Sequence, residues 1–301
     1  MQTQKICNAF TLDVEDYYHV SAFEKVISPA QWAALPSRVE RNTDVILEML
    51  NKNNIRGTFF VLGWVAERNP GMVRRIADSG HEVASHGYSH RLVYNQSQAV
   101  FREETIRSKK LLEDTIGKPV IGYRAASYSI TRKSLWALQV LAELGFSYDS
   151  SVFPVKHDRY GIYSAPRFPH RLTLESGAAI MEFPLSTSKV AGLNLPVAGG
   201  GYFRLFPYFL TRTGLGKINN QEQRPFIFYL HPWEVDVHQP RIKASLLSRF
   251  RHYQNLDTCQ LKLDRLLKDF SFTTVRGVLE SESARNAIAT VDIAQYTEGA
   301  R

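Results

Sequence analysis

Two histidines, His86 and His90, stand four residues apart directly after a strand-like run at 82–85. Another strand-like run, at 9–12, leads into a cluster of three carboxylates at 13–16. Two imidazoles and one carboxylate form the ligand set of a catalytic divalent metal, which keeps coordination positions open for water and substrate. A second carboxylate beside the ligands can act as a base. A histidine pair alone is as often structural, but its combination with acids at a strand end favours a metal-dependent hydrolase.

Three further polar residues, Arg124, Asp149 and His231, stand at the ends of other strand-like runs. Each has an ordinary structural explanation: a surface ion pair for Arg124, a helix N-cap for Asp149 and a buried structural histidine for His231. In a parallel barrel, however, the carboxyl ends of the strands form the active-site face. We therefore expect these residues to share one site with the histidine pair and the acidic cluster.

Strand-like and helix-like segments alternate along almost the whole chain, which predicts a mostly parallel α/β sheet, and the number of units suggests a barrel. The strand candidates are 6–14, 57–62, 82–85, 119–123, 147–150, 179–183, 226–230 and 272–275. The stretches 154–169 and 198–204 break this rhythm. The first is predicted to be a long loop, and the second a flexible turn at 198–201 that leads into an aromatic segment at 202–204. The polar segment 279–301 is predicted to be a loosely attached tail.

The 301 residues carry 37 Lys and Arg against 29 Asp and Glu, for a net charge of +8. Because the basic residues are scattered, the charge indicates solubility more than nucleic-acid binding, and no nucleic-acid partner is expected. Two cysteines far apart do not make a disulfide framework. No apolar run approaches the ~18 residues of a membrane span, and no secretory leader precedes the first strand. These features predict a cytoplasmic protein.

Six motifs, in order along the chain, resemble the polysaccharide deacetylases with a NodB-homology domain (carbohydrate esterase family 4). They are Thr11-Leu-Asp-Val-Glu-Asp-Tyr17, Arg56-Gly-Thr-Phe-Phe60, Gly80-His-Glu-Val-Ala-Ser-His-Gly-Tyr-Ser-His90, Gly122-Tyr-Arg124, Tyr148-Asp-Ser-Ser151 and Leu230-His-Pro232. Two others, at 157–161 and 199–202, look like a narrower branch associated with exosortase and exopolysaccharide gene clusters. The resemblance implies one deacetylase domain at 1–278, folded as a distorted (β/α) barrel of about seven parallel strands.

The resemblance also implies roles for the strand-end residues. Asp13 corresponds to the general base of the family, and Arg124 to the arginine that holds this base. His231 corresponds to the general acid. Asp149 falls in the motif that supports the acid, and Leu230 would line a pocket for the acetyl methyl group.

His86 and His90 correspond to metal ligands of the family, but the acidic motif departs from its pattern. The family carries two adjacent aspartates, whereas the acids here stand at 13, 15 and 16. Residues i and i+2 of an extended strand face the same side, so Glu15 is the expected third ligand and Asp16 the alternative. The mixed nitrogen and oxygen set favours zinc, and iron, cobalt or nickel would also fit.

The implied reaction is hydrolysis of an N-acetyl amide. The metal would polarise the acetyl oxygen and lower the pKa of bound water, and Asp13 would accept the water proton. His231, kept charged by Asp149, would protonate the departing nitrogen. The oxyanion would rest on the metal and on a backbone N–H near Ala125. The family's Arg-x-Pro-Tyr pattern reads Arg124-Ala-Ala-Ser127 here, which leaves the shape of this loop open.

The predicted function is removal of N-acetyl groups from an amino-sugar polysaccharide, or from its lipid-linked precursor in exopolysaccharide biosynthesis. The partner is then an N-acetylated glycan, and the protein could act at the inner membrane face. Tyr128 and Trp233 would stack on sugar rings, with Tyr202 and Phe203 as further candidates, although each could equally be core packing. The alternatives are a cyclic-imide or ureide amidohydrolase of the same fold and a non-catalytic glycan-binding homologue.

Overall fold

Strand β1 (Cys7–Val14) lies inside the sheet that carries the strand-end residues, and all of its residues except the first are buried. It pairs in parallel with β10 (Ile227–Leu230) on one side and β2 (Thr58–Val61) on the other. The computed structural model describes residues 6–157 and 159–297 of the chain. An apolar strand buried on both faces is typical of a parallel sheet covered by helices.

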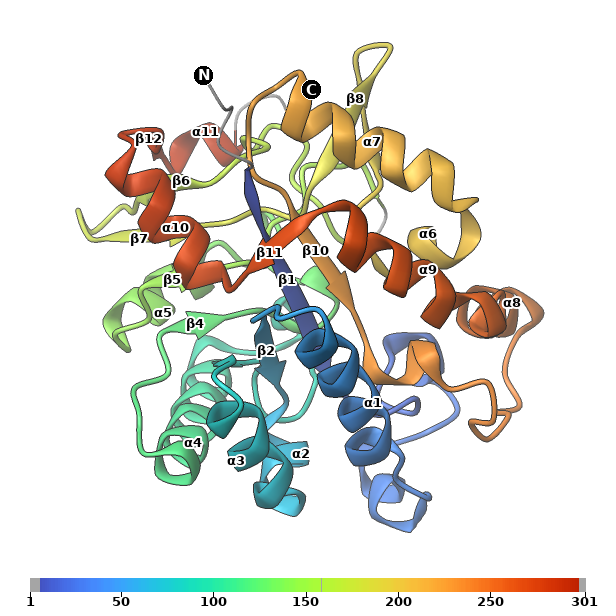
Figure 1. The fold of residues 1–301 in the computed structure, drawn as a ribbon. Helices are drawn as coiled ribbons and strands as arrows, with labels where there is room; N and C mark the ends of the chain where they lie inside the picture. The colour runs from blue at the N-terminus through green and yellow to red at the C-terminus, as the bar shows by residue number, and fades with distance from the viewer. Residues whose placement is uncertain (1–5, 158, 298–301) are drawn as a thin grey trace.

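Seven neighbouring strands of the sheet run parallel to one another. Their spatial order is β10, β1, β2, β3 (Glu82–Ser85), β4 (Gly122–Tyr123), β5 (Tyr148–Asp149) and β7 (Ala179–Glu182). Beyond β7 the sheet continues with the antiparallel β6 (His170–Thr173) and then β12 (Ala289–Asp292), and β11 (Ser271–Thr273) pairs with the first residues of β1. The expected mostly parallel α/β fold is confirmed (Figure 1).

Every strand candidate of the sequence corresponds to a strand of the structure, but four strands have no counterpart among the candidates. They are β6, β12 and the two strands of an antiparallel hairpin, β8 (Thr187–Val190) and β9 (Leu193–Pro196). Each of these strands exposes or half-exposes two or more of its residues. They therefore lack the continuous apolar run that identifies a buried strand.

Alternate residues of β1 face opposite sides of the sheet. Phe10 and Leu12 belong to the main core beneath the helices, whereas Ala9 packs with Tyr229 in a second core on the opposite face. Asp13 has the parity of Ala9. This alternation places the Asp13 carboxylate on the inner side of the curved sheet, at the carboxyl end of the strand.

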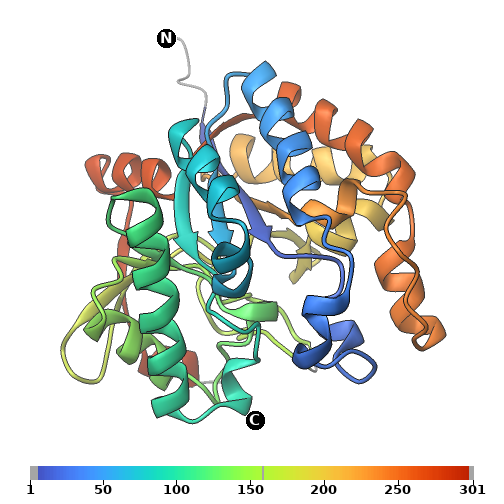
Figure 2. The ribbon, with the colours of Figure 1, turned by 90° about the horizontal axis from the view of Figure 1, so that it is seen from below.

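Helices pack along the strands and complete the layered fold (Figure 2). They are α1 (Val39–Lys52), α2 (Gly63–Arg68), α3 (Pro70–Asp78), α4 (Gln98–Ile116), α5 (Trp136–Glu143), α6 (Gly200–Leu205), α7 (Tyr208–Asn220), α8 (Leu246–Tyr253), α9 (Leu256–Asp269), α10 (Val275–Ala284) and α11 (Ala294–Thr297). α1 buries Val39, Ile46 and Leu50 on one stripe, as expected of a helix that covers a sheet. None of the described helices is both long and apolar enough to cross a membrane.

No direct ladder joins β7 to β10 in the described part of the chain. The segment after β7 fills the gap instead. The Ile227 N–H donates to Ser186 Oγ at 2.9 Å, and the Tyr229 N–H donates to the Ala198 carbonyl at 3.0 Å. The structure is consistent with the expected distorted barrel, in which side-chain and loop contacts take the place of one strand pairing.

The described part of 279–301 differs from the loose tail that its composition predicts. α10 runs on to Ala284, and β12 pairs in parallel with β6 over Ala289–Asp292. Tyr296 has 0% of its surface exposed, and its hydroxyl lies 2.6 Å from Nε2 of His170. Burial lowers the pKa of His170 to about 4, so at neutral pH its ring is uncharged beside the phenol. This segment is therefore packed against the domain.

We expect Tyr296→Ala to destabilise the protein by about 3 kcal/mol or more, the usual cost of truncating a buried aromatic side chain. Gln295→Ala, at the exposed neighbouring position, serves as the control and should leave the free energy of unfolding nearly unchanged. Urea denaturation measures both values. Equal stability of the two variants would mean that the segment is a loose tail after all.

Candidate metal and catalytic site

The strand-end residues meet in a cleft with a volume of about 460 Å³. Its floor contains Asp13, Glu15, His86, His90 and His231, which come from the ends of β1, β3 and β10. This is the face at which parallel α/β folds carry their sites, because the strands end there and the loops that follow converge. The expectation that these five residues share one site agrees with the geometry.

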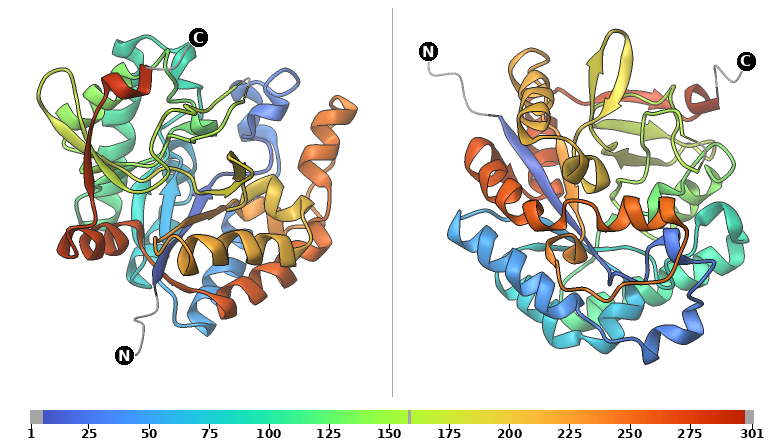
Figure 3. Two further views of the ribbon diagram at one scale, coloured as in Figure 1. Left: turned by 90° about the horizontal axis from the view of Figure 1, so that it is seen from above. Right: turned by 90° about the vertical axis from the view of Figure 1, so that its right-hand side faces the viewer.

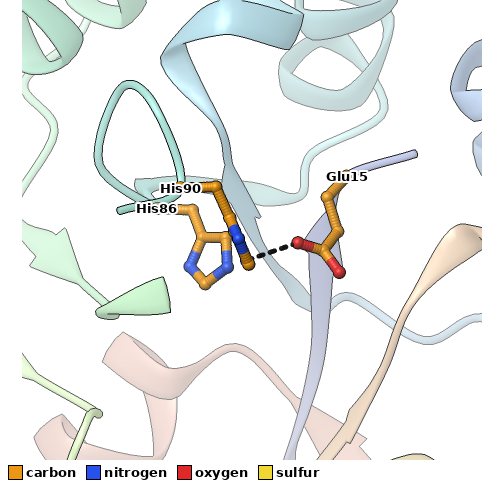
Figure 4. A group of neighbouring side chains, drawn as sticks. All are labelled: Glu15, His86 and His90. Carbon is orange, nitrogen blue, oxygen red and sulfur yellow. Dashed lines mark ion pairs between the residues drawn. The ribbon is translucent and has the colours of Figure 1, made fainter. Parts of the chain in front are cut away.

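Glu15, His86 and His90 offer three ligand atoms that all lie within 4.8 Å of one another (Figure 4). Glu15 follows β1 directly, and both histidines lie in the loop after β3. Oε2 of Glu15 is 2.6 Å from Nε2 of His90, yet within the described residues no N–H is aligned to donate to this oxygen. A buried carboxylate oxygen without a donor, facing an imidazole nitrogen, is what a cation between the two atoms would satisfy. The donor set therefore fits a divalent metal.

A backbone hydrogen bond fixes the orientation of His86. Its Nδ1 lies 2.8 Å from the carbonyl oxygen of Arg124. A carbonyl can only accept, so Nδ1 carries the hydrogen and Nε2 keeps the lone pair that a metal needs. Burial lowers the pKa of His86 to about 4. The ring is thus neutral at physiological pH, in the protonation state of a ligand.

The Glu15 carboxylate is ionised in this setting. Burial raises the pKa of Glu15, but the surrounding histidines, first His90 and then His231 and His86, together lower it by more, and the net pKa is well below the usual range. The indole N–H of Trp233 lies 3.4 Å from Oε1 and helps to orient the carboxylate. Two histidines beside one ionised carboxylate form a compact, buried donor cluster.

Asp16, the alternative ligand of the sequence analysis, points away from this cluster. Its Oδ2 accepts from Ser37 Oγ at 2.8 Å and from the backbone N–H groups of Arg38 and Val39 at 2.8 and 3.1 Å. Those N–H groups begin α1, so Asp16 stabilises a helix N-terminus from a distance in sequence. The geometry favours Glu15 as the third ligand.

Asp13 is held by a fully buried arginine. The guanidinium of Arg124 is 0% exposed and donates from Nη1 to Oδ1 of Asp13 at 2.7 Å. Nε and Nη2 of the same group donate to the backbone carbonyl and the hydroxyl of Ser150, so three sides of the guanidinium are occupied. The second oxygen, Oδ2, faces the cleft and has Tyr128 Oη 3.5 Å away. This arrangement makes Oδ2 the oxygen of Asp13 that can accept a proton from the cleft.

His231 faces the same space from the end of β10, the strand next to β1. Its Nε2 lies 3.9 Å from Oδ2 of Asp13 and 3.8 Å from Oε1 of Glu15, and its Nδ1 lies 2.7 Å from Oε1 of Glu234. Burial lowers the pKa of His231, but the carboxylates around the ring, first Glu234 and then Glu15 and Asp13, together outweigh burial, and the pKa rises to about 9. The imidazole is therefore protonated at neutral pH and carries a proton on the nitrogen that faces the cleft.

Glu234 takes the place that the sequence analysis gave to Asp149. The Asp149 carboxylate accepts from the backbone N–H and the hydroxyl of Ser151, at 2.9 and 2.6 Å, and it lies beside Glu182. Within the described residues no hydrogen bond or ion pair joins Asp149 to His231. The expectation that Asp149 supports the acid is therefore wrong.

A local signal for Glu234 is present in the sequence. His231 and Glu234 form the two ends of a capping box around the short 3₁₀ turn η5 (Pro232–Val235), with the His231 N–H donating to Glu234 Oε1 at 3.1 Å. A glutamate three residues after a residue that begins a helical turn is the spacing of that motif. The fixed backbone turn brings the carboxylate onto the imidazole ring as well.

Arg204 anchors Glu234 from the other side. Its side chain is 1% exposed, and Nε donates to Glu234 Oε2 at 2.6 Å. The remaining N–H groups donate to the backbone carbonyls of Arg251, His252 and Gln254 at 2.8 to 3.0 Å. Arg204 thus links Glu234, the partner of His231, to the C-terminal end of α8.

The stretch 198–204, predicted to be a flexible turn, is instead packed tightly against β10. Gly199 has a φ of +139°, and a Cβ there would lie 2.0 Å from the carbonyl oxygen of Tyr229. α6 begins at the next residue, Gly200. Gly199 and Gly200 allow the backbone to lie close to β10. This close contact places Arg204, four residues further along α6, beside Glu234.

Leu230 does not line the cleft. It is 0% exposed and belongs to the core beneath the helices, where Leu12 is its register partner on β1. The preceding residue, Tyr229, lines the cleft instead. Because successive strand residues face opposite sides, a one-residue offset moves the side chain from the site to the core. The acetyl-pocket assignment of Leu230 is therefore wrong.

Trp233 lines the cleft, but its ring is already stacked on other side chains. His231 stacks on it at a centroid distance of 5.1 Å and His252 at 4.1 Å. With 5% of its surface exposed, Trp233 offers a sugar ring little surface on which to stack. Tyr128 and Tyr202 do line the cleft, whereas Phe203 is fully buried in the core.

The backbone N–H of Ala125, expected to contact the oxyanion, is already used. It donates to Ser151 Oγ at 2.8 Å. The altered loop after Arg124 turns sharply, because Ser127 and Tyr128 both adopt left-handed backbone conformations with φ of 51° and 55°. Ser127 Oγ lies 3.0 Å from Ser21 Oγ, which ties the loop to the opposite wall of the cleft.

Two family models match the chain. A model described as polysaccharide deacetylase matches residues 32–148, and one described as a domain of unknown function (DUF3473) matches residues 150–280. A peptidoglycan-N-acetylglucosamine deacetylase of Bacillus cereus is 36% identical over 75 residues, which are 25% of this chain and 27% of that protein. A chitooligosaccharide deacetylase of Bradyrhizobium is 27% identical over 33% of this chain and 43% of that protein. These matches support the polysaccharide deacetylase family.

The matched stretches therefore span about a quarter to two fifths of the length of these two relatives. Solved structures match over most of the chain. A candidate polysaccharide deacetylase from Mycobacterium smegmatis has a TM-score of 0.63 at 20% identity, over 97% of this chain and 95% of that one. The allantoinase PuuE has a TM-score of 0.60 at 16% identity, over 93% and 91%. The fold is thus shared by a candidate glycan deacetylase and an allantoinase.

We predict that Glu15→Gln weakens Zn²⁺ binding by roughly 100-fold or more, because altering even the partners of metal ligands costs about 10- to 100-fold. Asp16→Asn should keep the metal and instead lose about 1 kcal/mol of stability, as removal of a helix-capping group does. Isothermal titration calorimetry with Zn²⁺ and urea denaturation measure the two effects. Loss of metal by Asp16→Asn with retention by Glu15→Gln would reverse the ligand assignment.

Glu234→Gln should lower the pKa of His231 from about 9 toward its ordinary range near 6.5, because the carboxylate that holds the charged ring is removed. NMR titration of the His231 ring in metal-free protein measures this pKa. Asp149→Asn is the matched control and should leave the pKa of His231 unchanged. The assignment fails if Asp149→Asn moves the His231 titration and Glu234→Gln does not.

Proposed function

We propose that this protein is a metal-dependent hydrolase that removes N-acetyl groups from an amino-sugar glycan. One observation carries the proposal: a carboxylate held by Arg124 and an imidazolium held by Glu234 face each other at 3.9 Å beside the Glu15, His86 and His90 cluster. A base, an acid and a ligand set in one cleft are the parts that amide hydrolysis needs. The deacetylase family match supports the same reaction.

In this proposal Glu15, His86 and His90 hold a divalent metal, with zinc favoured by the mixed ligand set and iron, cobalt or nickel also suited to it. Bound there, the metal supplies a Lewis acid for the amide oxygen and lowers the pKa of water. Every ligand atom is buried in the floor of the cleft, which excludes bulk solvent and strengthens the electrostatic interactions inside.

Asp13 acts as the general base through Oδ2, the oxygen that faces the cleft. Arg124 fixes the direction of this carboxylate through the bond to Oδ1. His231 acts as the general acid and delivers the proton on Nε2 to the departing amine. Glu234 keeps the ring charged and oriented through Nδ1. The acid therefore starts with the proton that it must deliver.

The substrate class rests on the cleft and on the relatives. Tyr128 and Tyr202 give the walls aromatic surface of the kind that sugar rings contact. The curated relatives are deacetylases of peptidoglycan and chitooligosaccharide. We extend the proposal to an exopolysaccharide or its lipid-linked precursor, in the exosortase-associated branch that the motifs at 157–161 and 199–202 resemble. Action in the cytoplasm, at the inner membrane face, remains a prediction.

A ureide or cyclic-imide amidohydrolase is the second candidate, because the allantoinase PuuE shares the fold at a similar TM-score. Acetate release separates the two activities. The purified protein, loaded with Zn²⁺, is assayed on N-acetylated chitooligosaccharides, peptidoglycan fragments and lipid-linked N-acetylated oligosaccharides, with allantoin in a parallel assay. Metal-stripped protein is the control. Acetate from a glycan supports deacetylation, and turnover of allantoin without acetate supports the alternative.

Asp13→Asn and His231→Ala should each reduce turnover by ~10²-fold or more, the scale expected when a general base or acid is removed. Both variants should retain the fold and the metal, measured by circular dichroism and elemental analysis. His238→Ala, at an exposed histidine outside the cleft, should keep full activity. Near-normal turnover in Asp13→Asn or His231→Ala would refute the role assigned to that residue.

A further inference from the structure

α8 carries three large apolar side chains on the outside of the molecule. Leu246, Leu247 and Phe250 are 81%, 58% and 59% exposed, although leucine and phenylalanine are usually buried. At the spacing of i, i+1 and i+4 they form one continuous stripe along the helix. Figure 3 shows this helix, in orange, at the edge of the fold beside the blue N-terminal loop that contains η1 (Ser21–Phe23).

Basic residues surround this stripe. Arg249 and Arg251 flank it on α8, and Arg241 and Lys243 lie in the loop that leads into the helix. The stretch 237–256 contains no aspartate or glutamate. All four basic side chains belong to exposed residues, and none of them forms an ion pair with another described residue. Together with the three apolar residues, these four make what we call the basic–apolar face.

The inner side of α8, opposite the basic–apolar face, is bound firmly to the domain. On the inner side of α8, His252 is 3% exposed, stacks on Trp233 and donates from Nε2 to Oε1 of Gln239 at 2.7 Å. Arg204 bonds three backbone carbonyls at the end of the helix. The buried side of α8 is thus bound to the domain, and its apolar outer side has no partner among the described residues.

The basic–apolar face is continuous with the mouth of the catalytic cleft. Leu247, Phe250 and Arg251 all line the cleft, together with Leu205 at the end of α6, which is 42% exposed. Whatever covers the face therefore also lies against the opening through which substrate reaches the site.

We propose that the basic–apolar face docks on the surface of an anionic lipid bilayer. A short helix with apolar residues on one stripe and cations on both sides matches the interface of such a bilayer, where acyl chains lie beneath negatively charged headgroups. Charge complementarity favours lipid over a protein partner, because the cations surround the stripe without any acid among them. Docking in this way directs the cleft mouth at the membrane. This orientation, which rests on the proposed function, favours a lipid-linked glycan as the substrate.

Vesicle co-sedimentation tests the proposal without an enzyme assay. We expect the full-length protein to sediment with vesicles of equimolar phosphatidylcholine and phosphatidylglycerol, to bind phosphatidylcholine vesicles much less, and to release at high salt. Leu246→Glu should weaken binding by at least about tenfold, because it places a charge where an apolar residue enters the bilayer. Arg249→Ala should weaken it roughly fivefold, equivalent to about 1 kcal/mol per cation.

Neither Leu246 nor Arg249 lines the cleft, so both variants should keep the activity of the wild type on a soluble substrate. The controls are Leu261→Glu, at a leucine of α9 that is 55% exposed, and Arg74→Ala, at an exposed arginine of α3. Both should bind vesicles as the wild type does. Loss of binding in Leu261→Glu equal to that in Leu246→Glu would overturn the proposal.

Equal binding to neutral and anionic vesicles, or no binding to either, would also overturn it. If the wild type is a dimer by size-exclusion chromatography and Leu246→Glu is a monomer that binds vesicles as the wild type does, the face is a protein interface and the proposal is wrong. Failure of the proposed function gives a different result: vesicle binding persists while no glycan releases acetate.

Discussion

The buried ion pair between Arg124 and Asp13 is the interaction on which the site depends. An arginine with 0% exposure has lost its hydration, and a guanidinium in that position is tolerated only when its N–H groups are all bonded. Here Asp13, Thr11 and Ser150 accept those bonds, and the ring of Phe60 lies 4.0 Å from the guanidinium carbon. Breaking a buried pair of this kind costs about 3 to 5 kcal/mol.

The backbone carbonyl of Arg124 has a second structural role. Its carbonyl fixes the tautomer of His86, while its side chain fixes Asp13. The proposed base and one proposed metal ligand are therefore positioned by the same residue at the end of β4. Arg204 plays a comparable part for the acid, because it holds Glu234, which holds His231. The two arginines act in opposite senses: Arg124 keeps its carboxylate available as a base, and Arg204 supports a carboxylate that keeps an imidazole charged.

Much of the fold and part of the site follow from local patterns. Apolar or largely apolar runs that alternate with amphipathic helices identify all seven parallel strands, because strands covered by helices are rich in apolar residues. The half-exposed strands β6, β8, β9 and β12 lack such runs, and Tyr296 is buried within a polar segment. These elements are stabilised by contacts with distant residues, such as that of Tyr296 with His170, which no short window of sequence contains.

The sequence by itself determined that Asp13, His86 and His231 stand at strand ends, and a parallel sheet must bring such ends to one face. The parity of residues 13 and 15 likewise indicated Glu15 as a ligand. Only the tertiary structure decided which carboxylate contacts His231, since Asp149 ends β5 and Glu234 follows β10, and the two differ in which partners their carboxylates reach. The tertiary structure also decided that Leu230 faces the core, and that the close contact of Gly199 with β10 places Arg204 beside the site. The physical reason is that strand order follows from hydrophobic pattern, whereas the direction of a side chain depends on the hydrogen bonds and close contacts that distant segments offer to it.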